Sequence, residues 1–189
     1  KSFNELGLAA PIARALAEEK YETPTPIQAG AIPPVLAGRD LVGIAQTGTG
    51  KTAAFILPAL QKLSVASKVQ SKGPRILVLT PTRELAQQVS DAATKYGKNM
   101  RVKVVSILGG MPYPLQNKLL SSPVDILVAT PGRLIDHIDR GRIDFSRLEM
   151  LVLDEADRML DMGFIDDVER IADATPASRQ TLLFSATLD

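Results

Sequence analysis

A phosphate-binding pattern carries the clearest chemistry in this sequence. Residues 45–52 read Ala-Gln-Thr-Gly-Thr-Gly-Lys-Thr and follow the apolar, β-prone run 40–44. Glycines let backbone N–H groups curl around phosphate oxygens. Lys51 adds a positive charge, and Thr52 offers a hydroxyl to a magnesium ion. A helix-compatible run follows and would direct its positive N-terminus at the same place. The strand–loop–helix order favours a nucleotide phosphate site over a glycine-rich turn with a surface lysine.

An acidic cluster about a hundred residues later supplies the groups that such a site needs. The apolar run 149–153 leads into Asp154, Glu155, Ala156 and Asp157. Asp154 would hold the metal ion, largely through water, and Glu155 would polarise the attacking water. Carboxylates are also favoured at helix N-termini for purely electrostatic reasons. The upstream Gly-Lys-Thr triplet makes metal-assisted phosphate chemistry the better interpretation.

The elements that would position these residues alternate between strands and helices. Continuous Ile/Leu/Val runs are typical of parallel strands buried on both faces. We therefore predict an α/β fold with a mostly parallel, doubly wound sheet flanked by helices, in a single domain over residues 1–189. Ligands of such sheets bind at the carboxyl ends of the strands. The strands are expected at 41–45, 75–80, 102–108, 126–129, 151–154 and 181–184, and the helices near 51–65, 83–96, 115–120, 132–140 and 165–174.

Composition excludes several other classes of protein. The 189 residues include no cysteine, which rules out disulfides and thiolate metal sites. No apolar stretch approaches membrane-spanning length and no signal peptide opens the chain, so we expect a cytoplasmic protein without membrane contact. Net charge is only +1, yet residues 62–118 hold ten basic and two acidic side chains, and residues 149–173 hold nine acidic and two basic ones. This asymmetry fits a polyanion-facing side and a cation-requiring site, or simply solvated helix faces.

The order of these motifs resembles a known family. The chain is similar over essentially its whole length to the N-terminal RecA-like domain of DEAD-box ATP-dependent RNA helicases, of bacterial type, whose name is spelled by residues 154–157. Ala45 matches the DEAD-box version of the phosphate loop, where the generic loop has glycine. The resemblance implies ATP and Mg²⁺ as cofactors, RNA as partner, and ATP hydrolysis coupled to local duplex unwinding. The nucleotide-binding residues that it implies in this loop are Gln46, Thr47, Gly48, Thr49, Gly50, Lys51 and Thr52.

Residues 20–28 resemble the adenine-reading Q motif of the family. The amide of Gln28 both donates and accepts, as the N6 and N7 edge of adenine requires, whereas guanine presents the opposite polarity there. Tyr21 would stack on the base and Thr23 would belong to the same site. Phe3 matches the family's isolated aromatic residue that packs near this motif. Lys20 stands where the family usually has glycine.

The resemblance also implies an RNA-binding face and a coupling network. Three segments each follow a predicted strand and offer helix N-termini or glycines to the sugar–phosphate backbone. None of them contains an aromatic residue, which favours backbone and 2′-hydroxyl contacts and sequence-independent binding. Ser185 and Thr187 would hydrogen-bond Asp157, and the single histidine, His137, is expected on a helix surface. The RNA-binding residues implied are Pro81, Thr82, Arg83, Gly109, Gly110, Thr130, Pro131, Gly132 and Arg133.

Two other functions remain open. An ATP-controlled RNA clamp or scaffold is compatible with the same motifs. A GTPase switch would need Asn-Lys-x-Asp, but Asn117-Lys118 is followed by two leucines. The chain contains no His-Arg-x-Gly-Arg-x-x-Arg segment, which in the family supplies arginine fingers from a second RecA-like domain, and the loss of such fingers costs about 10³–10⁵ in rate. We therefore expect this monomeric chain to be part of a longer protein, to bind nucleotide, and to be nearly inactive alone.

Overall fold

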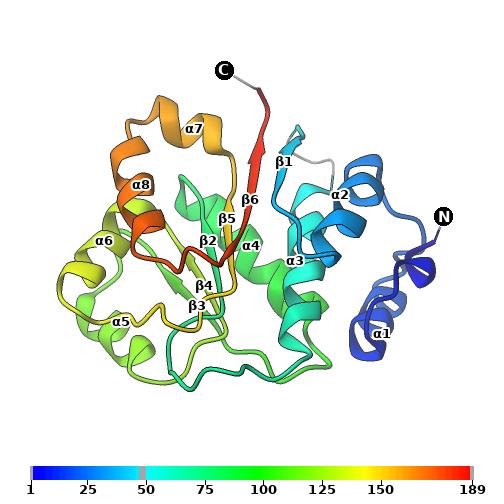
Figure 1. Cartoon of the computed structure of the whole chain (residues 1–189), viewed down its shortest axis with the longest axis horizontal. Coiled ribbons are helices and arrows are strands. Elements are labelled where there is room, and N and C mark those ends of the chain that lie inside the picture. Colours follow the sequence, from blue (N-terminus) through cyan, green and yellow to red (C-terminus); the bar gives the residue numbers. More distant parts are fainter. Residues whose placement is uncertain (1, 47–49, 188–189) are drawn as a thin grey trace.

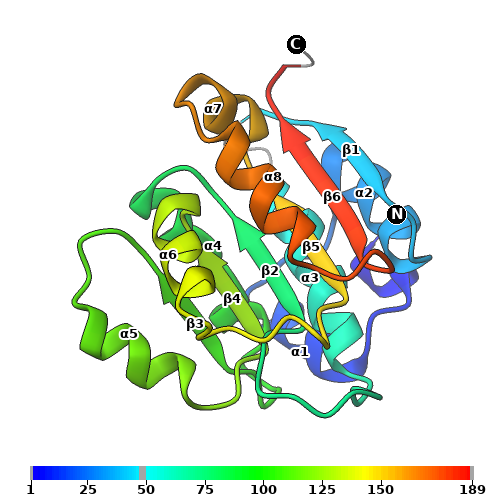
Figure 2. The same cartoon turned by 60° about the vertical axis from the view of Figure 1, so that its left-hand side comes forward.

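The computed structural model describes residues 2–46 and 50–187. They form a six-stranded sheet in the order β1-β6-β5-β2-β4-β3, and every neighbouring pair is parallel. Figures 1 and 2 show the strands running side by side with helices on both faces. This confirms the predicted doubly wound α/β sheet. The strands are β1 (Leu41–Ile44), β2 (Ile76–Leu79), β3 (Val104–Ile107), β4 (Ile126–Ala129), β5 (Met150–Leu153) and β6 (Gln180–Ser185).

The helices form two layers that cover opposite faces of the sheet. Helices α3, α4, α5, α6 and α8 correspond to the five predicted helices. Helices η1, α1, α2 and α7 were not predicted from the sequence. The bounds are η1 (Phe3–Leu6), α1 (Ala10–Glu18), α2 (Pro26–Leu36), α3 (Lys51–Leu63), α4 (Arg83–Tyr96), α5 (Tyr113–Leu120), α6 (Pro131–Asp139), α7 (Ala156–Asp161) and α8 (Ile165–Asp173).

Alternation along the strands builds two separate apolar cores. Side chains of a strand point to opposite faces in turn. Ile76 and Val78 of β2 therefore join the core under α1–α4, while Leu77 and Leu79 join the core under α6–α8. All four residues are fully buried. Burial on both faces explains why the central strands read as continuous apolar runs.

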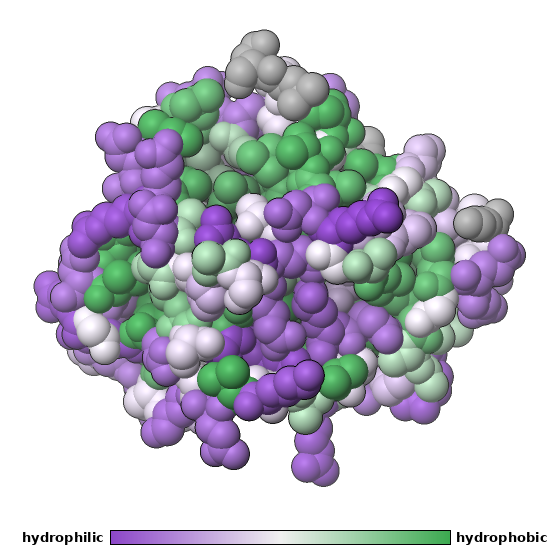
Figure 3. All heavy atoms as spheres, viewed as in Figure 1, coloured by the Kyte–Doolittle hydropathy of each residue, from purple (hydrophilic) through white to green (hydrophobic). Residues whose placement is uncertain are grey.

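The face of the sheet that α6–α8 cover is less covered over the edge strand β1. Val42 and Ile44 of this edge strand are exposed, as are Leu160, Met162 and Ile165 on and after α7. The upper part of Figure 3 shows apolar side chains gathered in this region. In the described ranges, the structure contains no helix with the length and apolar character needed to cross a bilayer.

Strand register places the motif-bearing segments at one edge of the sheet. Leu79, at the end of β2, pairs with Leu153 of β5 and with Ala129 of β4. Ile44 of β1 pairs with Ser185 of β6. Because all strands are parallel, the segments that follow them converge at their carboxyl ends, where ligands of such folds bind.

Candidate functional site

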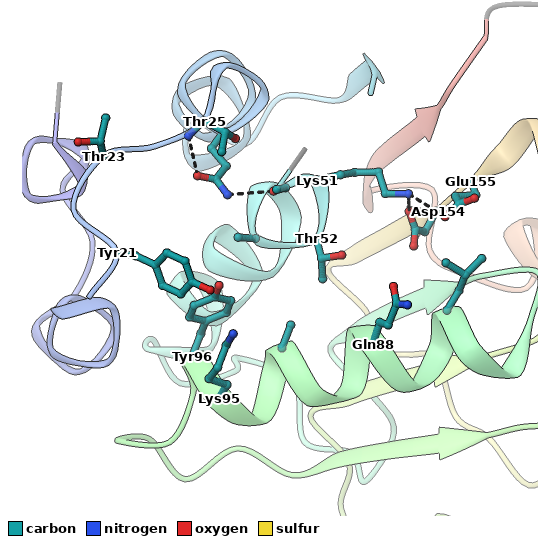
Figure 4. A pocket seen from close by; sticks show the side chains of 15 residues that line it. Tyr21, Thr23, Thr25, Lys51, Thr52, Gln88, Lys95, Tyr96, Asp154 and Glu155 are labelled. Atoms are coloured by element: carbon teal, nitrogen blue, oxygen red, sulfur yellow. Dashed lines mark hydrogen bonds and ion pairs between the residues drawn. The ribbon is translucent and has the colours of Figure 1, made fainter. Parts of the chain in front are cut away.

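A cavity of about 430 Å³ joins the segments predicted to bind nucleotide (Figure 4). It runs from the segment before α2, past the start of α3, to the end of β5, with α4 as its floor. Tyr21, Thr23 and Gln28 lie at one end, and Lys51 and the acidic pair after β5 lie at the other. The fold thus brings the two ends of the predicted ATP site into one cavity. Thr47, Gly48 and Thr49 lie outside the described residues, and Gln46 follows β1 as an exposed residue.

Lys51 bridges two acidic side chains at the phosphate end of the cavity. Gly50 has a φ of 84° and allows α3 to begin at Lys51. The Lys51 ammonium donates a hydrogen bond to Glu155 Oε2 at 3.1 Å and lies 2.9 Å from Asp154 Oδ1. The second contact has the distance of an ion pair but not the angles of a hydrogen bond. Among the described residues, Asp154 Oδ1 is therefore a buried acceptor without a hydrogen-bond donor.

The backbone at Glu155 explains how both carboxylates reach the same ammonium. Successive side chains of a strand point to opposite faces, but Glu155 leaves the end of β5 with φ 54° and ψ 54°. This left-handed conformation costs a non-glycine residue about 1–2 kcal/mol, and such strain is concentrated at functional positions. Burial raises the pKa of Asp154, against the lowering effect of the Lys51 charge.

The donor set suits a magnesium ion held mainly by water and phosphate. Among the described residues, no group of three or more His, Cys, Asp or Glu side chains could cage a metal ion. Mg²⁺ usually takes only one or two carboxylates and keeps several waters. Thr52 and Asp154 line the same cavity. Among the described residues, Asp154 Oδ1 accepts no hydrogen bond and has only its ion pair with Lys51, so it could accept from a metal-bound water, and these residues fit the ion.

Gln28 connects the adenine end of the cavity to the phosphate loop. Its Oε1 accepts from the Thr25 N–H at 2.9 Å, and its Nε2 donates to the Gly50 carbonyl at 3.0 Å. An amide oxygen has a second lone pair and the NH₂ group a second hydrogen, so one acceptor and one donor position remain for a base. A Cβ on Gly50 would overlap the Gln28 amide, which makes glycine necessary there.

Helix α4 adds residues to the cavity that sequence reasoning missed. Leu85, Gln88, Ala92, Lys95 and Tyr96 line its floor. Their spacing marks one face of a helix, but nothing in the sequence indicates that this face meets the Q-motif segment.

The aromatic end of the cavity holds a cation. The Tyr21 and Tyr96 ring centroids lie 5.9 Å apart, and Lys95 Nζ lies 5.3 Å and 4.9 Å from the two centroids, respectively. Burial raises the pKa of Tyr96. Phe3 is buried in the core under α1–α4 and does not line the cavity. Its N–H donates to the Glu22 carbonyl.

Lys20 occupies a position that glycine would suit. Its φ is 62°. The Lys20 N–H donates to the Ala17 carbonyl and the Tyr21 N–H to the Leu16 carbonyl, a pattern that ends helices with a left-handed residue. The chain therefore has lysine where the family usually has glycine, but the backbone at this position still adopts a conformation that favours glycine.

The predicted RNA-binding segments follow β2, β3 and β4. These strands are adjacent in the sheet, with β4 between β2 and β3, so the segments lie together. Thr82 caps α4, its Oγ1 accepting from the Leu85 N–H at 3.2 Å. Gly110 has a φ of 87°, and a Cβ there would lie 3.0 Å from Arg83 Nη1. Pro81 is buried after β2. Thr130 precedes α6, Pro131 is its first residue, and Gly109 and Gly132 have open space where a Cβ would lie.

Three side chains lie differently from what the sequence predicted. Ser185 Oγ donates to the Thr187 carbonyl rather than to Asp157, because the two-residue turn after β6 brings that backbone acceptor within reach. Asp157 Oδ1 is a buried oxygen without a hydrogen-bond partner among the described residues. The guanidinium of Arg133, which is predicted to bind RNA, donates from Nη1 to the Met111 carbonyl at 2.7 Å. His137 is fully buried rather than on the surface.

Comparison with known proteins agrees with this geometry. A family model described as DEAD/DEAH box helicase matches residues 25–189. The chain is 55% identical over 188 residues to the ATP-dependent RNA helicase DeaD of Escherichia coli (strain K12), covering 99% of this chain and 29% of that protein. It is 52% identical over 188 residues to the ATP-dependent RNA helicase SrmB of the same strain, covering 100% of this chain and 42% of that protein.

A solved structure has the same fold. The crystal structure of a DEAD box protein from the hyperthermophile Methanococcus jannaschii superposes with a TM-score of 0.92 at 41% identity, covering 100% of this chain and 50% of that one. The likeness confirms the expected RecA-like fold. The chain spans at most half of the length of each of these proteins. By its motifs, its fold and these similarities, the chain belongs to the DEAD/DEAH box helicase family.

Proposed function

We propose that this chain is the ATP-binding and RNA-backbone-binding domain of an RNA helicase that couples ATP hydrolysis to local duplex unwinding. One observation carries the proposal: a single cavity holds Gln28 at one end and Lys51, clamped between Asp154 and Glu155, at the other. The names of the relatives DeaD and SrmB support the ATP-dependent and RNA-directed parts. A cytoplasmic, monomeric protein with a second RecA-like domain is part of the same proposal.

Lys51 exchanges partners when nucleotide enters. Without nucleotide its ammonium forms ion pairs with both Asp154 and Glu155. The terminal phosphates of ATP would draw the ammonium away, leaving Asp154, with Thr52, to hold the metal ion through water. Glu155 would then accept a proton from the attacking water as general base. When bound, Mg²⁺ would neutralise part of the negative charge of the phosphates. Gln28 would pair with adenine, and Tyr21 would stack on it.

The coupling role of Asp157, Ser185 and Thr187 is also part of the proposal. Asp157 Oδ1 is buried and has no hydrogen-bond partner within residues 2–46 and 50–187, so either hydroxyl could donate to it after the turn at 185–187 rearranges. On the RNA side, the N-termini of α4 and α6, with Arg83 and Gly110, would hold phosphates and sugars of one strand.

The decisive experiment is RNA-stimulated ATP hydrolysis by the full-length protein that contains this chain. Glu155→Gln should abolish turnover while preserving ATP binding, because the amide keeps the size of the side chain but cannot accept the proton. Surviving turnover would show that Glu155 is not the base. The 189-residue chain alone should bind ATP but show little RNA-stimulated turnover.

Two measurements separate the alternatives. An ATP-controlled clamp would hydrolyse ATP and hold RNA without unwinding a duplex, so a strand-displacement assay on the full-length protein distinguishes it. Tighter binding of GTP than of ATP would favour the GTPase interpretation and contradict the assignment of Gln28.

A further inference from the structure

Two of the segments proposed to bind RNA are joined by a buried polar network. One is the turn of residues 108–111, which follows β3. The other is the start of α6, which follows β4. Ile107 and Ala129 pair in the parallel ladder, so the sheet places the two segments side by side. The backbone bonds beyond the ladder are long: Thr130 N–H to the Ile107 carbonyl at 3.3 Å, and Met111 N–H to the Leu108 carbonyl at 3.4 Å. Side chains provide additional hydrogen bonds that hold the turn 108–111 in place.

Gln116 of α5 is the centre of this network and is fully buried. Its Nε2 donates to the Leu108 carbonyl at 2.8 Å. Its Oε1 lies 3.2 Å from Arg133 Nη1 and 2.6 Å from His137 Nε2. Arg133 Nη1 also donates to the Met111 carbonyl at 2.7 Å. Side chains from α5 and α6 therefore hold the carbonyls at both ends of the turn.

One arrangement of protons satisfies the network. Because Gln116 must donate from Nε2 to a carbonyl, its Oε1 can only accept. His137 therefore carries its proton on Nε2, and its Nδ1, 3.4 Å from Arg142 Nη1, is an acceptor. The imidazole is neutral, in keeping with the burial and the Arg142 and Arg133 charges that lower the pKa of His137.

We propose that Gln116 and His137 are positioning residues for RNA binding, which hold the turn 108–111 against the start of α6. The proposal rests on the RNA-binding function proposed above. Both side chains are inaccessible to solvent, so neither can touch RNA itself. The turn contains Gly109 and Gly110, and a glycine pair loses much conformational entropy when RNA orders it. Holding the turn in advance lowers that cost and fixes the spacing of the two segments.

The same network explains the internal contacts of Arg133. Its guanidinium stacks over the Tyr113 ring, 4.2 Å from the centroid, while Nη1 binds the turn. The side chain thus acts on the turn from within, and the start of α6 is left to meet RNA through its backbone N–H groups.

The test measures two affinities of the full-length protein: for fluorescent single-stranded RNA in the presence of a non-hydrolysable ATP analogue, and for the analogue alone. Gln116→Met keeps the side-chain length and removes the three hydrogen bonds of the amide. We expect RNA binding to weaken about tenfold, with unchanged affinity for the analogue. The salt dependence of RNA binding should also be unchanged, because no charge is removed. Gln70→Met makes the same substitution at an exposed loop residue and should change neither affinity.

A second pair of variants separates the hydrogen bond from the volume of the side chain. His137→Gln retains an N–H donor toward Gln116 and should bind RNA nearly as the wild type does, whereas His137→Leu should resemble Gln116→Met. The double variant with methionine and leucine should be no weaker than either single variant, because both remove one network. If Gln116→Met does not fold, Gln116→Glu provides the same test, since it keeps the volume and replaces the donor to Leu108 with an acceptor.

Several outcomes would overturn the proposal. Folded variants that bind RNA as tightly as the wild type would show that the network does not position the turn. Equal loss of RNA and analogue affinity would show a general structural role only. Wild-type protein that binds the analogue but no RNA would overturn the proposed function and this inference together, which distinguishes that failure from the first two.

Discussion

Replacing Lys51 with methionine tests whether its ammonium stabilises the nucleotide-free site. Its Nζ lies 2.9 Å from Asp154 Oδ1 and 3.1 Å from Glu155 Oε2, and the three side chains are 7%, 2% and 10% exposed, respectively. Methionine keeps the length of the side chain but removes its charge. Two adjacent, largely buried carboxylates would then remain, with only the half-exposed Arg158 guanidinium, 3.5 Å from Glu155 Oε1, as a counter-ion among the described residues.

The expected loss follows from this burial. Removing one partner of a buried ion pair costs about 3–5 kcal/mol. Uptake of a proton by one carboxyl limits the cost to about 4 kcal/mol at neutral pH. Asp154 is the better proton acceptor, because burial already raises its pKa. For a domain of this size each kcal/mol lowers Tm by about 2–4 °C, so a loss of about 3–4 kcal/mol should make Lys51→Met melt about 6–16 °C below the wild type.

The assay is thermal unfolding without nucleotide, followed by circular dichroism. Thr52→Ala is the matched control, since Thr52 is the neighbouring nucleotide-binding residue but neutralises no carboxylate. It should lose nucleotide affinity with little change in Tm. Lys51→Met combined with Asp154→Asn should recover most of the loss, because one negative charge is removed. A Lys51→Met variant as stable as the wild type, or a double variant less stable than the single one, would show that the Lys51 ammonium does not stabilise the nucleotide-free site.

Three further predictions concern stability, pH and base recognition. Lys20→Gly should raise the free energy of unfolding by about 0.5–1 kcal/mol, because it relieves the strain of a left-handed backbone at a non-glycine residue. Glu19→Gly, where φ is −85°, should lower the free energy of unfolding. If denaturant unfolding ranks the two variants in the opposite order, the backbone at Lys20 is not strained. The folded-state pKa of His137 lies below its unfolded value, so its stabilising contribution is present above about pH 6.5 and is lost as pH falls through the folded pKa. Melting curves from neutral to mildly acidic pH should therefore fall more steeply for the wild type than for His137→Gln, and parallel curves would count against a buried neutral imidazole. Gln28→Glu keeps the acceptor for the Thr25 N–H but loses its donor, so ATP affinity should drop about tenfold in a fluorescence titration; unchanged affinity would mean that Gln28 does not read the base.

Long apolar runs made much of the fold predictable, and short or proline-containing helices did not. β2 and β4 are buried on both faces, so their sequences contain little except Ile, Leu, Val and Ala. Helix α2 carries Pro33 and Pro34 in its interior, which sequence reasoning takes as a break. The six residues of α7 are too few to show a helical period.

Part of the candidate site could likewise be predicted and part could not. Lys51 and Asp154 belong to motifs whose local sequence pattern indicates the chemistry, and both residues line the cavity. His137 was misplaced although it follows Leu134 by three residues, the spacing of one helix face, and both are fully buried. That spacing was the available signal. It could not show that Gln116, on a different helix, would face the imidazole.

The nucleotide chemistry could be predicted from the amino-acid sequence, because residue types at fixed spacing after a strand indicate a phosphate loop and an acidic partner. The sheet could be predicted as well, because parallel strands buried on both faces require apolar side chains throughout. Which polar groups bond to one another could be seen only once the helices and strands were packed. Packing turned the Arg133 guanidinium inward to Met111, bonded Ser185 to Thr187 rather than to Asp157, and buried His137 against Gln116. These pairings depend on which helix faces meet after packing, and each buried donor takes the nearest acceptor that the packing provides.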